Sequence, residues 1–448
     1  MEIELAGVCA MDEPRCRVRE RILARVVETA MVLVLGGCAS TRPMMPTPTI
    51  YTQGVAQPFG ELPAARKSAE LDILYITDRA RDPEAGPRLY GSGRSPSLAF
   101  GNAVVRIGND VSWETLVSDA TTSDRPVDLD LTLESVTELA RTPPTPYPFA
   151  LVDGKPVTLP EVTEKLRSAA AVARQTIVQR LAETSHKDVF IYVHGVANQF
   201  DDAVYATAEM WHFVGREGVP ICYTWPAGGG GLLTGYTYDR ESSEFTIYHF
   251  KRVLGMLSDI PEIERIHIVA HSRGTDVTVS ALRELFIEAW AAGEHPRKRY
   301  RIRNVILAAP DLDVEVLLQR SGSERLPLGV HRATIYTYKD DEAIGAATFL
   351  FESNLRAGKL TEEALEEYPT LKAQSATAAN YNLAVVTYTG SRGGEFGHNY
   401  FRTNPAVASD ALLAVRYDRD PGAANGRPLK HRGLFFWEIS DDYLQSPP

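Results

Sequence analysis

The residues best suited to chemistry in this 448-residue chain are Ala270-His271-Ser272-Arg273-Gly274. They follow an apolar run, 266–269, and precede a helical pattern, which is the strand–turn–helix setting of a G-x-S-x-G nucleophile elbow. Such a turn exposes the serine hydroxyl at the tip of a strand and leaves backbone N–H groups at a helix N-terminus free to bind an oxyanion. The same residues also fit an ordinary turn with a capping serine. The partners of Ser272 therefore decide between the two interpretations.

A nucleophilic serine needs a base, and the base needs a carboxylate to orient it. In the doubly wound hydrolase fold these residues come in the order Ser, Asp or Glu, His, each on a loop after a strand. The sequence offers this order. Asp341 follows the strand-like run 334–338, and His398 lies in the glycine-rich segment 393–400, which can carry an imidazole back over Ser272. We therefore assign Asp341 as the acid and His398 as the base.

Other residues remain open for these two roles. Asp340 is the neighbour of the chosen acid, and Asp311 and Asp313 follow the preceding strand. An acidic residue after a strand is also a frequent helix N-cap, so a purely structural role fits each of them. Among the ten histidines, His431 is the next candidate base, although its basic segment with Pro and Gly is typical of a surface.

Backbone donors for an oxyanion are predicted on two loops. His194-Gly195 directly follows the apolar run 189–193, and the glycine allows the backbone to turn the N–H of Val196 toward the nucleophile. The second donor is the N–H of Arg273, the residue after the serine. The loss of one such donor typically lowers the rate by ~10²–10³.

Composition argues against several other classes of function. The formal net charge is −11 and no basic stripe occurs, so we expect no nucleic-acid partner. No His/Asp/Glu spacing is typical of a metal site, and we predict no metal. Gly228–Gly231 lacks the Lys-Ser/Thr of a phosphate loop, so we expect no cofactor and interpret it as a loop at the rim of the pocket. No pattern indicates the oligomeric state.

The N-terminal residues predict export. Arginines between residues 15 and 25 precede the apolar stretch 30–35 and then Gly36-Gly37-Cys38-Ala39. This order is typical of a cleaved signal and is too short for a spanning helix. Leu-Gly-Gly-Cys resembles the lipobox of bacterial lipoproteins, which implies that 1–38 is a signal peptide and that a lipid on Cys38 anchors the protein to the cell envelope, on the periplasmic side or at the outer membrane. The alternative is an apolar helix with a buried cysteine.

The residues after this signal predict a tether and one domain. Residues 39–68 are rich in Pro, Thr and Gly and are expected to be extended. The catalytic domain is placed at 69–448. With Cys9 and Cys16 removed with the signal, we expect Cys222 to be a small buried side chain in a strand.

From residue 71 onward the pattern alternates between strands and helices. Residues 110–160 are polar and Pro-rich and are predicted as loops, and 345–380 as a partial lid. The alternation implies an α/β fold, with a mostly parallel, doubly wound sheet and helices on both faces. Strands are predicted at 71–77, 103–107, 189–193, 219–225, 266–270, 305–309, 333–338 and 383–389, and helices at 159–183, 201–215, 243–257, 275–291, 341–367 and 406–417.

Several motifs, in their order along the chain, resemble a bacterial family of α/β-hydrolases of unknown function. The resemblance implies the α/β-hydrolase fold and places Ser272, Asp341 and His398 on the family's triad positions. Two residues depart from the family pattern, Ala270 where Gly is usual and Arg273 where a smaller or apolar residue is usual. We expect Arg273 to pair with a nearby carboxylate, and the alternative is an acidic group of the substrate. The resembling segments are Tyr75–Arg79, Val193–Gly195, Thr224–Pro226, Ala270–Gly274, Ala309–Asp313, Tyr336–Ala343 and His398–Phe401.

These features together predict a lipid-anchored serine hydrolase that cleaves a small-molecule, ester-type acyl substrate through an acyl-enzyme. Two other hypotheses remain open. One is an acyltransferase or thioesterase on the same triad, which a competing alcohol or thiol acceptor would reveal. The other is a catalytically inactive, surface-anchored binding module, because fold alone does not settle function.

Overall fold

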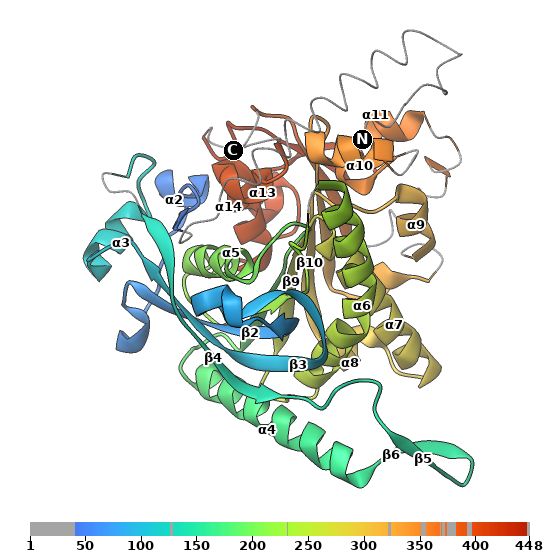
Figure 1. Cartoon of the computed structure of the whole chain (residues 1–448). Helices are drawn as coiled ribbons and strands as arrows, with labels where there is room; N and C mark the ends of the chain where they lie inside the picture. The colour runs from blue at the N-terminus through green and yellow to red at the C-terminus, as the bar shows by residue number, and fades with distance from the viewer. Residues whose placement is uncertain are drawn as a thin grey trace, which may run out of the picture.

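A 12-stranded sheet forms the centre of the fold (Figure 1). The computed structural model describes residues 41–125, 129–230, 232–320, 324–350, 355–367, 369, 372–373, 382–391 and 397–445. The strands are β1 (Arg42–Pro43), β2 (Glu70–Arg81), β3 (Tyr90–Ile107), β4 (Asp130–Arg141), β7 (Asp188–Val193), β8 (Val219–Thr224), β9 (Arg265–His271), β10 (Ile302–Ala308), β11 (Arg332–Tyr338), β12 (Leu383–Tyr388), β13 (Lys430–Gly433) and β14 (Phe436–Ile439). Their order across the sheet is β1-β4-β3-β2-β8-β7-β9-β10-β11-β12-β14-β13.

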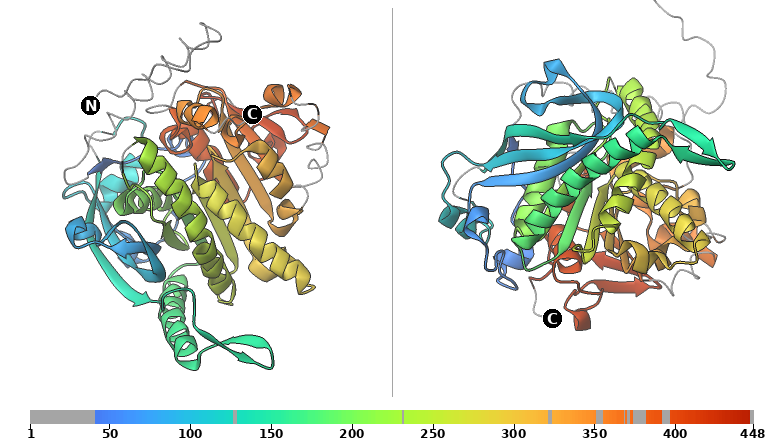
Figure 2. Two further views of the ribbon diagram at one scale, coloured as in Figure 1. Left: turned by 45° about the vertical axis from the view of Figure 1, so that its right-hand side comes forward. Right: turned by 90° about the horizontal axis from the view of Figure 1, so that it is seen from below.

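Helices cover both faces of this sheet (Figures 1 and 2). One hydrophobic core joins α4, α6 and α7 to the sheet, and a second joins α5 and α14 to the opposite face. The helices are α2 (Thr49–Thr52), α3 (Trp113–Asp119), α4 (Pro160–Ala182), α5 (Phe200–Phe213), α6 (Leu232–Ser258), α7 (Gly274–Ala291), α8 (Pro296–Tyr300), α9 (Val314–Leu318), α10 (Glu342–Leu350), α11 (Glu362–Glu366), α13 (Tyr400–Thr403) and α14 (Pro405–Val415).

The strands from β2 through β8, β7, β9, β10, β11 and β12 to β14 pair in parallel. Successive side chains of such a strand enter opposite cores. In β7, Ile191 and Val193 face α4, α6 and α7, whereas Tyr192 faces α5 and α14. The apolar runs found in the sequence are therefore strands buried on both faces, as predicted. Their carboxyl ends meet at one edge of the sheet, where ligands bind in folds of this type.

The prediction that residues 110–160 are loops is wrong. This stretch contains α3, β4 and a hairpin of β5 (Phe149–Val152) and β6 (Lys155–Thr158), which projects from the body near one end of α4 (Figure 2). β3 pairs antiparallel with both β2 and β4, so the chain does not begin with a βαβ unit. β4 buries Leu131 and Leu133 but exposes polar side chains along the rest of its length, which hid it from a search for apolar runs. The strands β13 and β14 after the last helix were also not predicted.

The segment predicted as an extended tether is packed against the domain. Met44, Met45, Ile50 and Tyr51 are buried. The backbone N–H of Ile50 donates to Ser409 Oγ on α14 at 2.9 Å, and the Tyr51 hydroxyl donates to a backbone carbonyl at the end of α5. The folded domain therefore includes β1 and α2, which precede the predicted start at residue 69. The predicted signal peptide, 1–38, lies outside the described residues.

In the part of the chain described here, no helix combines the length and the apolar character needed to cross a bilayer. Cys222 is a buried free thiol in β8, as predicted, and burial raises its pKa to about 12. Such a thiol is inert at neutral pH.

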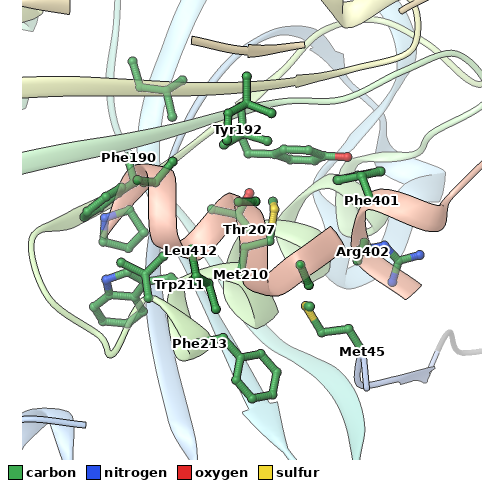
Figure 3. Close-up of a pocket in the computed structure, with 18 of the residues that line it drawn as sticks. Met45, Phe190, Tyr192, Thr207, Met210, Trp211, Phe213, Phe401, Arg402 and Leu412 are labelled. Carbon is green, nitrogen blue, oxygen red and sulfur yellow. The ribbon is translucent and has the colours of Figure 1, made fainter. Parts of the chain in front are cut away.

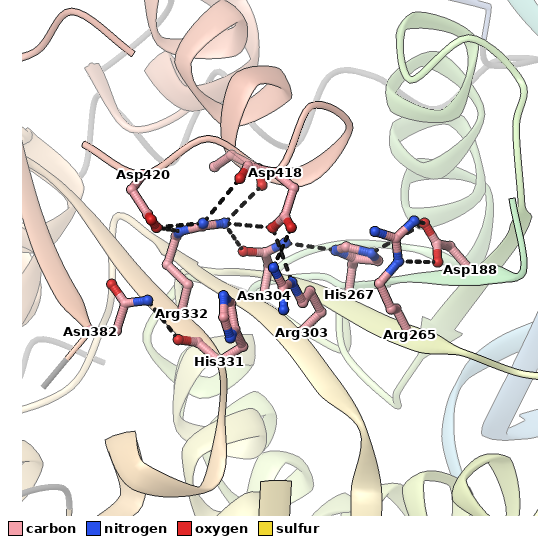
Figure 4. Close-up of polar contacts among 11 residues, drawn as sticks. Asp188, Arg265, His267, Arg303, Asn304, His331, Arg332, Asn382, Asp418 and Asp420 are labelled. Carbon is pink, nitrogen blue, oxygen red and sulfur yellow. Dashed lines mark hydrogen bonds and ion pairs between the residues drawn. The ribbon is translucent and has the colours of Figure 1, made fainter. Parts of the chain in front are cut away.

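The amino ends of the central strands are held by polar contacts (Figure 4). Arg265 of β9 binds both carboxylate oxygens of Asp188 in β7, at 2.7 and 2.8 Å. Asn304 of β10 contacts His267 at 2.9 Å and accepts a hydrogen bond from Arg332 of β11 at 2.8 Å. These contacts fix the register of four strands at the edge opposite the predicted site.

An apolar cavity of about 80 Å³ lies between α5, α14 and the sheet (Figure 3). Phe190 and Tyr192 form its wall on β7, Met210 lines it from α5, and Leu412 lines it from α14. Several polar side chains in its wall are bonded elsewhere: Thr207 donates to a carbonyl of its own helix, Tyr336 donates to Asp410, and Arg402 pairs with Glu209. The space is thus lined mainly by apolar side chains.

Candidate active site

Ser272 occupies a strained turn between β9 and α7. Its φ is +52°, in the left-handed region that residues other than glycine rarely adopt, at a cost of about 1–3 kcal/mol. Two hydrogen bonds hold the turn: the Ser272 N–H donates to the Ala308 carbonyl at 3.0 Å, and Thr275 Oγ1 donates to the Ser272 carbonyl at 2.7 Å. This is the geometry of the nucleophile elbow that the sequence predicted.

The last residue of the elbow motif is required to be small. A Cβ built on Gly274 would lie 2.3 Å from the His194 carbonyl oxygen and 2.7 Å from that of Val193. The glycine therefore allows α7 to start directly against the end of β7. Ala270, at the first position of the motif, is fully buried, so its methyl group is accommodated in the core.

The loop after β7 lies directly against the serine. A Cβ on Gly195 would be 2.7 Å from the Ser272 Cβ. Ala197 has a φ of +58°, which turns the chain sharply between this loop and α5. Among the residues that the structure describes, no hydrogen-bond acceptor is found for the backbone N–H of Val196 or of Arg273. These are the two donors that the sequence predicted for an oxyanion.

His194 is a structural residue of this loop. It is fully buried and stacks on Trp225 with ring centroids 5.0 Å apart. Its Nε2 accepts from the Trp225 N–H at 3.0 Å, and its Nδ1 lies 2.8 Å from the Gly195 carbonyl oxygen. Burial, aided by the charge of Arg79, holds its pKa well below the ordinary value. The imidazole is neutral, and because Nε2 accepts, Nδ1 carries the proton and donates to Gly195.

Asp239 of α6 ties the same loop to the one after β8. Its carboxylate accepts from the Ala197 N–H at 2.7 Å and from the Gly228 N–H at 3.0 Å. Burial raises the pKa of Asp239, although both N–H groups act in the opposite direction. No pattern in the sequence indicates Asp239, since its partners are backbone groups on two distant loops. The predicted rim loop at 228–231 is thus held by α6, while Gly231 lies outside the described residues.

Asp341 and His398 form a hydrogen-bonded pair. Asp341 Oδ2 lies 2.7 Å from His398 Nδ1, and the Asp341 side chain is fully buried. The other carboxylate oxygen accepts from the Ile344 N–H at 2.9 Å, so Asp341 also caps α10. Burial lowers the pKa of His398, but the charge and the hydrogen bond of Asp341, with a further contribution from Asp311, outweigh it. The pKa of His398 is raised as a result.

The pair lies beside the elbow. The His398 carbonyl oxygen is 3.3 Å from Nε2 of His271, and the two imidazole rings are 4.7 Å apart. Phe401 stacks on the imidazole ring of His271, with the ring centroids 4.6 Å apart. Burial and the neighbouring His398 hold the pKa of His271 well below its ordinary value, so it is a neutral support for the base. Residues 392–396 of the predicted glycine-rich segment lie outside the described residues.

The alternative acids and base have other partners. Asp340 is exposed, and Asp313 accepts from two N–H groups as the N-cap of α9. Asp311 is buried beside the elbow, where it pairs with Arg356 and accepts from the Tyr236 hydroxyl. His431 is exposed on β13. Asp311 therefore acts on His398 through its charge and not as its hydrogen-bonded carboxylate.

The Arg273 side chain is bonded to other protein groups. Its guanidinium pairs with Asp276 at 2.6 Å, one turn further along α7, and donates to Ser243 Oγ at 3.0 Å. The expectation that Arg273 pairs with a nearby carboxylate is confirmed, and a cation in the first turn of the helix is thereby neutralised. In the described ranges, no three His, Cys, Asp or Glu side chains gather as a metal site.

A comparison with protein families identifies the chain. The model of an alpha/beta hydrolase of unknown function (DUF900) matches residues 169–416. The chain belongs to the DUF900 family. The match runs from α4 to the end of α14 and includes Ser272, Asp341 and His398. The resemblance and the α/β-hydrolase fold inferred from the sequence are both confirmed.

Solved structures are also similar to this DUF900 member. One is an acylaminoacyl peptidase from Pyrococcus horikoshii, with 10% identity and a TM-score of 0.31; the alignment covers 76% of this chain and 56% of the peptidase. Another is a lipase-esterase related protein from Clostridium acetobutylicum, with 12% identity, a TM-score of 0.20, and 46% and 75% coverage. This chain thus spans little more than half the length of the peptidase. No curated protein matches it.

Proposed function

We propose that this protein is a serine hydrolase that cleaves ester-type acyl substrates through Ser272, His398 and Asp341. The observation that carries the proposal is the 2.7 Å contact between His398 Nδ1 and a buried Asp341 carboxylate, beside an elbow that holds Ser272 in a left-handed turn. Membership of a family of α/β hydrolases supports the same reaction class.

The proposed reaction uses each group once in each half. His398 takes the proton of the Ser272 hydroxyl as Oγ attacks the carbonyl carbon, and Asp341 stabilises the imidazolium that forms. The tetrahedral intermediate collapses, and the leaving alcohol takes the proton from His398. Water then attacks the acyl-enzyme, His398 accepts its proton, and the carboxylic acid leaves with Ser272 restored.

The oxyanion of each intermediate is bound by the N–H groups of Val196 and Arg273. Their freedom from other acceptors in the described chain, and the contact of Gly195 with Ser272, support this role. Donors fixed in advance in a buried site stabilise developing charge without reorganising, which is commonly the largest contribution to such catalysis.

The proposal is tested by turnover of p-nitrophenyl acetate and butyrate. We expect Ser272→Ala to lower kcat by about 10⁴–10⁶-fold with an unchanged Tm. Ser258→Ala is the matched control, since Ser258 is also buried and its hydroxyl bonds to a carbonyl of its own helix. Equal activity of wild type and Ser272→Ala would reject the mechanism. An acceptor alcohol that raises turnover would instead identify an acyltransferase.

We also propose that the protein is exported and anchored by a lipid on Cys38. Support comes from the sequence, in which a basic segment, a short apolar stretch and Leu-Gly-Gly-Cys follow one another as in bacterial lipoprotein signals. Metabolic labelling with an alkyne fatty acid in a bacterial host is expected to modify wild type and not Cys38→Ser. Labelling of both, or of neither, would contradict the anchor.

A further inference from the structure

We infer that Arg79 is a positioning residue for the oxyanion hole. The inference rests on the proposed serine mechanism and adds a role for the segment Thr77–Arg79, which that mechanism does not use. Arg79 stands near the end of β2 and is 1% exposed. The segment was noted in the sequence as a motif, but nothing in its residue types indicated which part of the site it serves.

The guanidinium of Arg79 ties together the loops that surround the predicted hole. Its Nη2 donates to the Asn198 carbonyl at 2.8 Å, in the loop that carries Val196. Its Nη1 donates to the Ala227 carbonyl at 2.8 Å, in the loop after β8, and its Nε donates to Thr224 Oγ1 at 2.8 Å. Planar donors in a fixed fork suit this task, because one side chain sets the relative position of several backbone groups.

Arg79 is held by neutral groups. Within the described chain it forms no ion pair, and its acceptors are three carbonyls, a hydroxyl and, at 3.4 Å, Nε2 of His194. Burial lowers its pKa to about 10, against the opposing charges of Asp239 and Asp78, so it remains a cation at neutral pH. A buried cation without an ion-pair partner is costly unless its donors are satisfied, and the carbonyls of the loops around the hole satisfy those of Arg79.

Arg79 acts on the oxyanion hole through His194. Arg79 Nη2 lies 3.4 Å from His194 Nε2, which also accepts the Trp225 N–H. The Thr224 hydroxyl, 3.3 Å away, is a third neighbour and can also donate, so Nε2 is unprotonated and the proton is on Nδ1, which donates to the Gly195 carbonyl. In a trans peptide the C=O and the N–H point in opposite directions. The Gly195–Val196 peptide is thus fixed with its N–H turned away from His194, as an oxyanion donor requires.

The rest of the Thr77–Arg79 segment supports the same loops. Thr77 Oγ1 donates to the Thr224 carbonyl at 2.7 Å, at the end of β8. Asp78 Oδ2 accepts from Thr246 at 2.7 Å and contacts His249 Nδ1 at 2.8 Å, which fixes α6. α6 in turn carries Asp239, the acceptor for the Ala197 N–H. Strand β2 therefore positions the hole both directly and through a helix.

The test compares Arg79→Met with Arg216→Met. Arg216 is equally buried and also donates to backbone carbonyls, those of Arg66 and Ser68, so its loss measures what any buried arginine contributes to folding. The readouts are kcat and KM for p-nitrophenyl acetate and the Ki of phenylboronic acid. Its boron accepts Ser272 Oγ and becomes a tetrahedral anion, which mimics the charge that the hole binds.

We expect Arg79→Met to lower kcat by about 10²-fold with KM unchanged, as for a misplaced transition-state contact, and to weaken the boronate by a similar factor. Arg216→Met is expected to change the Tm and to leave kcat, KM and the Ki of the boronate unchanged. Unchanged kcat and Ki in folded Arg79→Met, or an equal loss in both variants, would overturn the inference. Wild type that is neither active nor labelled at Ser272 would instead reject the proposed function.

If Arg79→Met does not fold, Thr224→Val replaces it. This nearly isosteric change leaves the arginine in place but removes the acceptor of Arg79 Nε, together with the 3.3 Å contact of the same hydroxyl with His194 Nε2. We expect kcat to fall about tenfold, the effect of losing one hydrogen bond to a charged group, with the boronate weakened in parallel. Unchanged kcat and Ki in this variant would overturn the inference.

Discussion

Gly195 is the residue on which the contact between the oxyanion loop and the nucleophile depends most directly. We expect Gly195→Ala to lower kcat by about 10²-fold, because its Cβ would lie 2.7 Å from that of Ser272 and the loop must shift away. Ester turnover and thermal unfolding measure the effect. Gly255→Ala is the control, since a Cβ there meets nothing within 4 Å, and it is expected to keep full activity. Unaltered turnover in Gly195→Ala would contradict the position of this loop.

The Asp341–His398 pair predicts a specific pH dependence. The base must be neutral to accept a proton, and its pKa is raised in the folded protein. The acid limb of kcat/KM is therefore expected above the ordinary histidine value of about 6.5. Asp341→Asn removes the charge that raises the pKa and leaves burial, which lowers it. The limb should move to lower pH while kcat falls by about 10⁴-fold. A limb that stays in place, or moves to higher pH, would contradict the assignment.

Residue order along the chain was enough to propose Ser272, Asp341 and His398 as one site, because each follows a strand whose carboxyl end meets the same edge. The supporting residues could not be found in this way. His194 was noted for its glycine neighbour and not for its ring, and Asp239 and Arg79 contact backbone groups of distant loops. A contact to a backbone group does not require a particular residue type at the partner position, so it produces no recognisable pattern in the sequence.

Among the secondary-structure elements, the strands that are buried on both faces were predicted best from the sequence. Runs such as 189–193 contain little else than apolar residues, and the structure confirms the strands predicted at 189–193, 219–225 and 266–270 within one position at each end. β4 and the β5–β6 hairpin have polar or exposed faces, and no simple alternation marks them. Helix α6 begins 11 residues before the predicted start at 243, in a glycine- and tyrosine-rich segment that lacks helical spacing.

The cavity between α5 and α14 gives a prediction about packing (Figure 3). An empty space of about 80 Å³ costs roughly 2 kcal/mol, at about 24 cal/mol per Å³. Ala408 lines it from α14, and Ala408→Leu is expected to raise the Tm by about 2–4 °C by filling part of it. Met210→Ala enlarges the space and should lower the free energy of unfolding by about 2–5 kcal/mol. A lower Tm in Ala408→Leu would show that the space is closed or occupied.

In the molecule as a whole, the two edges of the sheet differ in structure. The carboxyl edge carries the strained elbow and the loops around it, whereas the amino edge is tied by ion pairs and hydrogen bonds (Figure 4). A strained turn can persist when the surrounding structure is rigid. The polar contacts at the amino edge thus contribute to the rigidity that the strained turn at the carboxyl edge requires.

The packed N-terminal segment predicts how the chain tolerates truncation. A protein that starts at residue 41 should keep the Tm of the full mature chain. One that starts at 69 loses the buried Met44, Met45, Ile50 and Tyr51, so we expect it to unfold at least 10 °C lower or to aggregate. Thermal unfolding of the two forms decides the point. Equal stability would show that this segment is a tether after all.

The same packing limits the reach of the proposed anchor. Cys38 precedes β1 by four residues, which span at most about 14 Å when extended. The domain would therefore lie close to the membrane surface and not at the end of a long linker. Moving the anchor outward by a flexible insertion after residue 40 should leave turnover of a soluble ester unchanged.

The most direct test of the central claim is to map the residue that a fluorophosphonate modifies in the protein from residue 41 onward. We predict a single adduct on Ser272, formed much more slowly in His398→Gln, where the hydroxyl has no base. An adduct on another residue, or ester turnover that continues with Ser272 unmodified, would contradict the account.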